Sequence, residues 1–241
     1  MILIDGDIIC YRTVFSKEAE SVEDLLTIAD TYVRNIVNKT ATADNDDYKV
    51  FLTGKGNYRN TLATTAPYKG NRPKEKPEHL DTVRSHLRDR HPSVVSSGEE
   101  ADDLIAIEAT ERGANCVICS IDKDLDQIPG KHYNFVKDIH YTVTPWKGLV
   151  FFYSQILTGD RVDNVIGIRG IGPAKAMKAL AECKTELQLF QKCVEMYEGD
   201  TARVIENGKL LWLRRYESEI WIPPTDTEAQ GSEEKKQAEA T

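Results

Sequence analysis

Two stretches decide the fold: residues 1–12 read MILIDGDIICYR, and residues 116–124 read CVICSIDKD. In each stretch a short apolar run, rich in β-branched side chains, ends at an aspartate. Runs of this kind are typical of buried strands, and they occur at residues 2–4, 48–52, 93–95, 116–121 and 133–136. Segments of helical period lie at residues 22–39, 77–90, 99–112, 152–157, 173–183 and 186–197. This alternation predicts an α/β fold with a mainly parallel twisted sheet flanked by helices.

The strand pattern ends near residue 153. We therefore expect an α/β core over residues 1–153 and a smaller helical module over residues 154–224. The remaining stretch, 225–241, contains acidic residues, lysines and alanines but no larger core-forming side chain, and we expect it to be disordered.

Composition narrows the class of protein. The chain has 241 residues, of which 40% are hydrophobic and 29% charged. It contains no apolar run near the roughly 18 residues that a membrane-spanning helix needs, and its charged start is unlike a secretory leader. The five cysteines are odd in number and widely spaced, which argues against a disulfide framework. We expect a soluble, cytoplasmic protein with no membrane partner.

Charge is unevenly distributed. The net charge of −8 alone argues against a general nucleic-acid binder. Residues 55–91, however, hold nine basic and four acidic side chains, and this stretch is a candidate for phosphate contact.

Acidic residues follow the predicted strands, where ligand groups collect in an open parallel sheet. Asp5 ends the first run, and Asp122 and Asp124 end the fourth. These last two lie at a strand end, so their side chains share one face, because alternate residues of an extended chain point the same way. The helix after the third run opens with further acids: Glu100, Asp102 and Asp103.

A further acidic pair, Asp160 and Asp163, is spaced to lie on one side of a helical turn. Any single pair could merely cap a helix or solvate a turn. Four sets in these contexts instead favour a metal centre, because clustered carboxylates repel unless cations neutralise them. Carboxylate oxygen is the ligand that Mg²⁺ and Mn²⁺ prefer.

A glycine-rich segment, GIRGIGPAK, follows at residues 167–175. A turn with several glycines before a helix that starts at Pro173 presents backbone N–H groups at a helix N-terminus. This arrangement is typical of phosphate binding, and Lys175 adds a positive charge.

Five blocks together carry a resemblance to a known family. They are LIDGDIICYR (3–12), YKGNRP (68–73), GEEADDLIA (98–106), SIDKDLDQI (120–128) and LTGDRVDNVIGIRGIGPAKA (157–176). The chain resembles the 5′ nuclease family: flap endonucleases, bacteriophage 5′→3′ exonucleases and the 5′ nuclease domain of bacterial DNA polymerase I. The resemblance implies a PIN-like core with a short arch near residues 68–97. It also implies a helix-three-turn-helix module that grips duplex DNA, with K⁺ as a candidate ligand.

The resemblance implies two Mg²⁺ ions, for which Mn²⁺ can substitute. It assigns one group of acids to the first ion: Asp5, Glu100, Asp102, Asp103 and Asp122. It assigns another group to the second ion: Asp124, Asp160 and Asp163.

The same resemblance makes Lys69 and Arg72 catalytic residues that contact the scissile phosphate. It places these residues against DNA: Arg12, Lys55, Arg59, Gly167, Gly170, Gly172 and Lys175. One departure concerns Thr53, because the family usually has an aspartate at this position. Another is the short interval between Arg72 and Gly98, which leaves room for a short arch at most.

The expected function is a metal-dependent 5′→3′ exonuclease or 5′ flap endonuclease of a bacterium or phage, giving 5′-phosphate products. Its expected partner is duplex DNA with a 5′ end, nick or flap, bound by a monomer, and an RNA–DNA hybrid is left open. One alternative is a haloacid-dehalogenase-like phosphatase, because Asp5, Asp7, Thr53 and Asp160 imitate its motif order. Another is a branched-DNA-binding protein with weakened catalysis.

Overall fold

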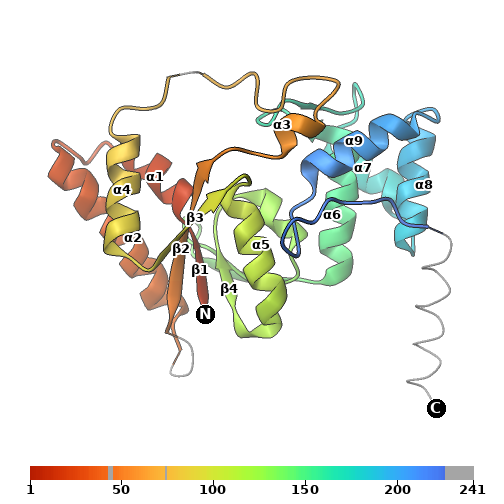
Figure 1. The fold of residues 1–241 in the computed structure, drawn as a ribbon. Coiled ribbons are helices and arrows are strands. Elements are labelled where there is room, and N and C mark those ends of the chain that lie inside the picture. Colours follow the sequence, from red (N-terminus) through yellow and green to blue (C-terminus); the bar gives the residue numbers. More distant parts are fainter. Residues whose placement is uncertain (43–45, 74, 226–241) are drawn as a thin grey trace, which may run out of the picture. The chain divides into compact units, whose positions relative to one another are not determined.

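The computed structural model describes residues 1–42, 46–73 and 75–225, so the expected disordered tail, apart from its first residue, lies outside the described residues. The described chain forms two compact units (Figure 1). The first contains residues 1–58, 73–148 and 213–219. Among the described residues, the second contains 59–72, 149–212 and 220–225. The chain thus passes from one unit to the other several times.

A six-stranded sheet forms the centre of the first unit, in the order β3-β2-β1-β4-β5-β6. Neighbouring strands run parallel except for β5 and β6, which form an antiparallel pair. The strands are β1 (Ile2–Asp5), β2 (Tyr48–Lys55), β3 (Ser93–Ser97), β4 (Val117–Cys119), β5 (Gly130–Asn134) and β6 (Ile139–Val143). This arrangement confirms the predicted α/β fold with a mainly parallel sheet.

Helices cover both faces of this sheet (Figure 1). Along β1, Ile2 and Ile4 point to one face and Leu3 to the other, as expected for a strand that is buried on both sides. Three helices pack on the first face: α1 (Gly6–Val14), α2 (Val22–Thr40) and α4 (Leu80–Arg90). The opposite face is covered by α5 (Ala101–Arg112).

A segment from late in the sequence completes the first unit. Leu213 is 6% exposed and packs in the same cluster as α5. Its backbone N–H donates to Gln127 Oε1 at 3.2 Å. The next residue, Arg214, pairs with Glu99 at 2.7 Å, and its guanidinium lies 3.7 Å from the ring centre of Tyr58. The segment therefore belongs to the core of the first unit.

The second unit is mainly helical. Its helices are α3 (Arg59–Leu62), most of α6 (Pro145–Thr158), α7 (Pro173–Leu180), α8 (Glu186–Met196) and α9 (Thr201–Leu211). A short hairpin joins β7 (Gly159–Asp160) to β8 (Val165–Ile166). Phe152 anchors an aromatic core, with ring centres 4.8 Å from Trp212 and 5.5 Å from Trp221. These ring contacts belong to the hydrophobic cluster of the second unit.

Several elements were not predicted: α1, α3, α9, β6 and the β7–β8 hairpin. Asp5 both ends β1 and caps α1, so no break in the sequence separates the strand from the helix. Helix α9 contains Gly208, whose missing side chain admits the ring of Trp221: an added Cβ would lie 2.3 Å from that ring. The expectation of no strand after residue 153 was wrong, because a two-residue pairing is too short to produce a periodic pattern.

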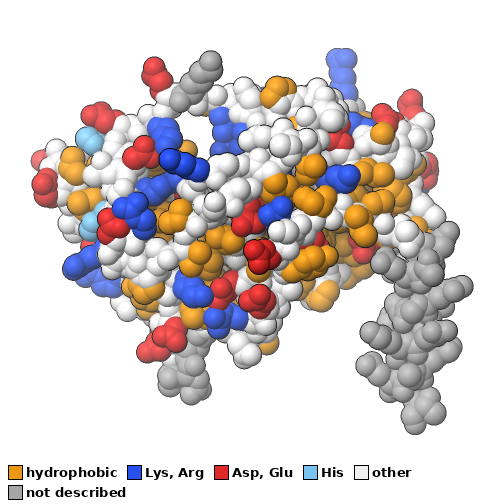
Figure 2. All heavy atoms as spheres, in the orientation of Figure 1, with side chains coloured by type: hydrophobic (Ala, Val, Ile, Leu, Met, Phe, Trp, Pro, Cys, Tyr) orange, Lys and Arg blue, Asp and Glu red, His pale blue; other side chains and the backbone are white. Residues whose placement is uncertain are grey.

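Basic side chains gather on the face of the first unit around α4 (Figure 2). Arg84, Arg88 and Arg90 lie on this helix, within the basic stretch identified in the sequence. Within the described ranges, none of the helices has the length and apolar character to cross a membrane.

Candidate functional site

The candidate site of the first unit begins at Asp5, where β1 passes into α1. Its carboxylate is 2% exposed. Oδ1 accepts the backbone N–H of Ile8 at 3.1 Å and so caps α1, while the Ser120 hydroxyl donates to Oδ2 at 2.6 Å. The strand and the helix therefore hold Asp5 at the carboxyl end of the sheet, where the sequence predicted a ligand group.

The next acids lie at the start of α5, and they make different contacts. Glu100 is the N-cap residue and Asp102 lies in the first turn. Asp103 is fully buried, and its carboxylate accepts the N–H groups of Glu100 at 3.1 Å and of Arg214 at 3.3 Å. Asp103 thus fixes the helix start and the 213–219 segment, which is a structural role beside the predicted ligand role.

Asp122 follows β4, but the chain there is not extended. Residues Lys123–Gln127 form a short 3-10 helix, and Asp122 caps it by accepting the N–H of Asp124 at 2.9 Å. The argument that Asp122 and Asp124 alternate on one strand face was therefore wrong. The backbone N–H of Asp122 also donates to Ser120 Oγ at 2.9 Å, so Ser120 connects Asp122 with Asp5.

These carboxylates lie close enough to repel one another. The pKa of Asp5 is raised to about 7, first by burial and then by the charges of Asp7 and Asp122, against hydrogen bonds that lower it. The pKa of Asp102 is raised well above its usual value, first by burial and then by Asp5, Asp122 and Glu100. Carboxylates with raised pKa values mark a place where a cation would relieve the repulsion.

The donor set fits a hard divalent cation by its chemistry. Asp5, Glu100, Asp102 and Asp122 offer only oxygen ligands, which Mg²⁺ and Mn²⁺ prefer. Among the residues that the structure describes, no three His, Cys, Asp or Glu side chains already surround a common point that could hold a metal ion. The fit to a divalent cation therefore rests on the negative charge and the oxygen atoms of these side chains, and not on a formed coordination geometry.

Asp160 and Asp163 belong to the second unit, where hydrogen bonds and cations of that unit hold them. Asp160 Oδ1 accepts the N–H groups of Val162 at 2.7 Å and of Asp163 at 3.1 Å, which shapes the turn after β7. The Asp163 carboxylate receives the Tyr68 hydroxyl at 2.6 Å and Arg72 Nη2 at 2.8 Å. Lys69 Nζ lies 3.5 Å from the same carboxylate.

The YKGNRP motif and the second acidic pair therefore meet within one unit. Lys69 and Arg72 both form ion pairs with the Asp163 carboxylate. The two predicted catalytic residues therefore contact a predicted metal ligand. Lys69 itself has a φ of 54°, in the left-handed region, and its N–H donates to the carbonyl of Asp163 at 2.8 Å. This backbone hydrogen bond offsets the cost of that conformation.

The glycine segment lies between β8 and α7. Gly167 passes close to α6, since an added Cβ would be 2.1 Å from the carbonyl carbon of Thr158. Gly170 has a φ of 81°, which favours glycine. Gly172 is the N-cap residue of α7, and Lys175 Nζ donates to the carbonyl of Gly170 at 2.9 Å. These features match the predicted turn that precedes a helix N-terminus.

The structure corrects the assignment of Arg59 as a DNA contact. Arg59 is 1% exposed, and its guanidinium donates to the carbonyls of Leu210 at 2.9 Å and Trp212 at 2.7 Å. A guanidinium enclosed in this way stabilises the second unit and cannot reach a phosphate. Lys55, at the end of β2, and Arg12, in the last turn of α1, are exposed as that role requires.

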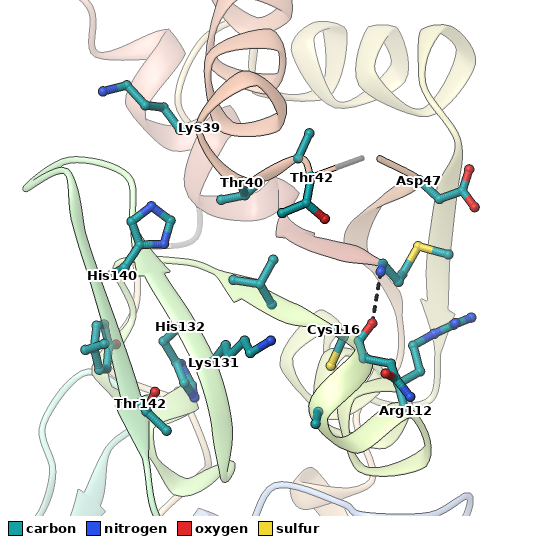
Figure 3. Close-up of a pocket in the computed structure, with 16 residues that line it drawn as sticks. Lys39, Thr40, Thr42, Asp47, Arg112, Cys116, Lys131, His132, His140 and Thr142 are labelled. Atoms are coloured by element: carbon teal, nitrogen blue, oxygen red, sulfur yellow. Dashed lines mark hydrogen bonds between the residues drawn. The ribbon is translucent and has the colours of Figure 1, made fainter. Parts of the chain in front are cut away.

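A pocket of the first unit lies away from the acids of the candidate site. It has a volume of about 850 Å³ and is lined by the ends of α2 and α5, the starts of β1, β4 and β5, and part of β6, including Lys39, Arg112, Lys131 and His140 (Figure 3). None of the acids predicted as metal ligands lines it. The candidate site is therefore defined by the carboxylates at the other ends of the strands and not by this pocket.

Sequence reasoning missed several side chains that organise the acids: Ser120, Arg84 and Tyr68. It singled out Thr53 as a departure from the family, but not as the acceptor of the Ala101 N–H at the start of α5. Ser120 and Tyr68 lie inside the motifs quoted above, so position alone could have drawn attention to them. Arg84 is separated from its partner Asp7 by 77 positions, and no local pattern indicates that pairing.

Comparison with known proteins finds relatives of this chain in sequence and in fold. The DNA polymerase I of Caldicellulosiruptor bescii is 26% identical over 234 residues, which cover 87% of this chain and 27% of that protein. The flap endonuclease Xni of Shewanella piezotolerans is 28% identical over 146 residues, which cover 55% of this chain and 56% of that protein. The chain thus matches only part of the length of either relative.

Solved structures share the fold. The bacteriophage T5 D15 protein crystallised with metal ions aligns with a TM-score of 0.69 at 17% identity, over 87% of this chain and 88% of that chain. A T5 D15 flap endonuclease complex with DNA and metal ions aligns with a TM-score of 0.67 at 18% identity, over 87% and 88%. The family model described as 5′-3′ exonuclease, N-terminal resolvase-like domain, matches residues 1–150. Since this match covers more than half of the chain, the protein belongs to that 5′-3′ exonuclease family.

Proposed function

We propose that this protein hydrolyses DNA phosphodiester bonds at or near 5′ ends, as a divalent-metal-dependent 5′→3′ exonuclease and flap endonuclease. The observation that carries the proposal is the group of mutually repelling carboxylates at the carboxyl end of the sheet, within a chain of the 5′-3′ exonuclease family. The family membership leaves the phosphatase alternative without support.

In the first unit, Asp5, Asp102 and Asp122, with Glu100, would hold a divalent ion. Such an ion supplies Lewis-acid activation of a phosphodiester and a lowered pKa for water. Ser120 keeps Asp5 and Asp122 in fixed positions through its hydroxyl, and the N-terminus of α5 adds a favourable dipole for the charged form of its acids. Assignment of Asp124, Asp160 and Asp163 to a second ion, and of K⁺ to the glycine segment, is proposed from the resemblance.

Basic side chains would neutralise the phosphate. Lys69 and Arg72 present two positive charges from one turn, and in the structure they satisfy the Asp163 carboxylate. Preorganised cations lower the cost of charge that develops on phosphoryl oxygens. We propose that substrate phosphate and Asp163 share these two side chains.

The remaining contacts would select the shape of the DNA and not its sequence. The N–H groups around Gly172 and the Lys175 side chain suit phosphate oxygens, which carry no base information. Complexes of structural neighbours with a DNA substrate and with Holliday junction DNA support branched DNA as a substrate class. Cleavage of RNA–DNA hybrids and action as a monomer belong to the same proposal, and binding should weaken as salt rises.

The test uses a duplex with a labelled 5′ flap and a matching blunt duplex, each with Mg²⁺ or EDTA. Wild type should cleave only with the metal, and the product lengths separate flap removal from stepwise digestion. Asp122→Asn should abolish cleavage. Asp126→Asn is the matched control, because Asp126 lies in the same 3-10 helix and its carboxylate accepts the Tyr141 hydroxyl at 2.7 Å.

Binding of the flap without cleavage, in both Mg²⁺ and Mn²⁺, would overturn the catalytic proposal and support the binding-protein alternative. Equal loss in Asp122→Asn and Asp126→Asn would show that the 3-10 helix matters for folding and not for metal chemistry.

A further inference from the structure

Asp7 is an acid that the proposed metal centre does not use. It lies in the first turn of α1, two residues after Asp5. Its carboxylate accepts Arg84 Nη2 at 2.8 Å and the backbone N–H of Thr53 at 3.1 Å. The side chains of Asp7 and Arg84 are 22% and 25% exposed, so the pair is a partly shielded, charge-assisted hydrogen bond. The contact joins α1, α4 and the end of β2.

Thr53 extends this contact to α5. Its hydroxyl oxygen accepts the backbone N–H of Ala101 at 2.9 Å. Ala101 is the first residue of α5 and directly follows Glu100. The Arg84 guanidinium also donates to the Thr53 carbonyl. Asp7 and Arg84 therefore form hydrogen bonds with both backbone polar groups of Thr53. The hydroxyl of Thr53 is thereby held in place against the helix start.

A second link runs beside the first one. The backbone N–H of Gly54 donates to Ser96 Oγ at 3.0 Å, and the Ser96 hydroxyl donates to the carbonyl of Glu99 at 2.6 Å. The strands approach so closely here that an added Cβ on Gly54 would lie 2.0 Å from the Ser96 carbonyl oxygen. The end of β2 and the residues before α5 are therefore fixed relative to each other.

We propose that Asp7 is a positioning residue of the metal centre: held by Arg84, it keeps Thr53 where the threonine hydroxyl fixes the start of α5. Glu100 and Asp102 lie at that helix start, so their placement relative to Asp5 depends on this chain of contacts. Members of the 5′ nuclease family, which this chain resembles, usually have an aspartate at the position of Thr53. In this chain the Thr53 hydroxyl accepts the Ala101 N–H, and the Thr53 backbone N–H donates to Asp7.

This inference rests on the proposed function, because it concerns the same metal centre. Its physical basis is general: groups that orient metal ligands typically change metal affinity 10–100-fold when they are removed, without touching the ion. Asp7 already satisfies a cation and a backbone N–H, so it acts through Thr53 and not as a ligand. Its loss should therefore weaken metal binding more than it weakens DNA binding.

The experiment titrates Mg²⁺ into the full chain without DNA and follows the melting temperature. Asp7→Asn keeps an acceptor for the Thr53 N–H but removes the charge that holds Arg84. We expect the Mg²⁺ concentration at half-maximal stabilisation to rise by about 10–100-fold. In cleavage assays at fixed Mg²⁺, kcat should fall while KM for DNA stays near the wild-type value.

Glu108→Gln is the matched control. Glu108 is also a mostly shielded acid of the first unit, 18% exposed, and it pairs with Lys49 at 2.9 Å and Arg112 at 2.6 Å. It lies six residues along α5 from Asp102, which is less than two turns. Removing its charge should lower the melting temperature and leave the Mg²⁺ midpoint unchanged.

A pair of threonine variants tests the hydroxyl directly. Thr53→Ser keeps the hydroxyl and should retain the wild-type Mg²⁺ midpoint, whereas Thr53→Val keeps the shape and should raise it. This pair decides the question if Asp7→Asn does not fold.

A wild-type Mg²⁺ midpoint in both Asp7→Asn and Thr53→Val would overturn the inference while leaving the proposed function intact. If wild type shows neither Mg²⁺-dependent stabilisation nor cleavage, the proposed function itself fails, and the two results are thus distinguishable.

Discussion

The acids of the two units are neutralised in opposite ways. In the first unit, Asp5 is buried and Asp102 is half-buried among other carboxylates, and desolvation together with the neighbouring charges raises the pKa of both. In the second unit, Asp163 receives the side chains of Tyr68, Lys69 and Arg72. An incoming cation would relieve repulsion in the first unit, but it would compete with protein cations in the second. On the proposed function, the aspartates of the first unit would bind metal, whereas Asp163 would share its cations with substrate phosphate.

The largest effect should come from Asp5→Asn. We expect cleavage to fall at least 100-fold, since loss of a ligand should exceed the effect of groups that only orient ligands. The metal-free protein should become more stable by roughly 2 kcal/mol, because a buried repelling charge is removed. Activity assays and melting curves in EDTA measure the two effects. A less stable metal-free variant would contradict the account of repulsion in the first unit.

The pH dependence of stability should follow from the same carboxylates. Asp5 has a pKa raised from 3.8 to about 7, so between these values the folded, metal-free chain holds a proton that the unfolded chain has lost. Its contribution to the free energy of unfolding therefore decreases as pH rises from about 4 to about 7 and is lost above that range.

Melting curves across this pH range in EDTA should show the decrease, and saturating Mg²⁺ should reduce it. Asp5→Asn serves as the control, because the difference between this variant and wild type isolates one group. An identical slope in the two proteins would remove Asp5 from the explanation.

Arg72→Gln should have effects of opposite sign. Releasing Asp163 from the guanidinium should favour metal binding in the second unit, whereas losing a cation for the phosphate should lower kcat by about 10-fold or more. Arg88→Gln is the control, since Arg88 is an exposed partner of Asp89 on α4. Isothermal titration with Mn²⁺ and cleavage rates test both parts. Weaker Mn²⁺ binding in Arg72→Gln would contradict the proposed competition.

Tyr68→Phe should produce the smallest change. It removes the hydroxyl that donates to Asp163 at 2.6 Å while keeping the ring that packs in the second unit. A hydrogen bond to a charged group contributes about 1.5–3 kcal/mol, and Arg72 and Lys69 remain to compensate for part of it. We expect a loss of about 1 kcal/mol in denaturant unfolding and a few-fold loss of activity. An effect as large as that of Arg72→Gln would give Tyr68 a direct role in substrate binding.

The sheet and its acidic edge were predictable because both depend on local patterns. Continuous apolar runs marked β1 and β2, and parallel pairing then gathered their carboxyl ends. The course of the chain after Asp122 was not predictable, because Asp122 turns it directly into a 3-10 helix. The motifs indicated which acids to consider. They could not show that the buried Asp103 carboxylate accepts backbone N–H groups, whereas the Asp102 carboxylate lies near other negative charges.

Long-range pairing explains the other failures. Arg59 reads as a surface base in a basic stretch, but its partners are the carbonyls of Leu210 and Trp212, about 150 positions later in the chain. Arg84 lies in the same stretch and reaches Asp7 instead of solvent. Such contacts satisfy buried polar groups, and tertiary structure alone decides which basic side chains they recruit.

The late segment 213–219 has a consequence for synthesis and for truncation. The first unit obtains Leu213 for its core and Arg214 for Glu99 only after residue 219 has left the ribosome, although its sheet ends at Val143. A fragment that stops at residue 150, where the family model ends, lacks the Arg214 N–H that donates to Asp103 and leaves apolar surface uncovered. Translation of the second unit is therefore a condition for finishing the first one, and a nascent chain carries its acids before it has the segment that completes their support.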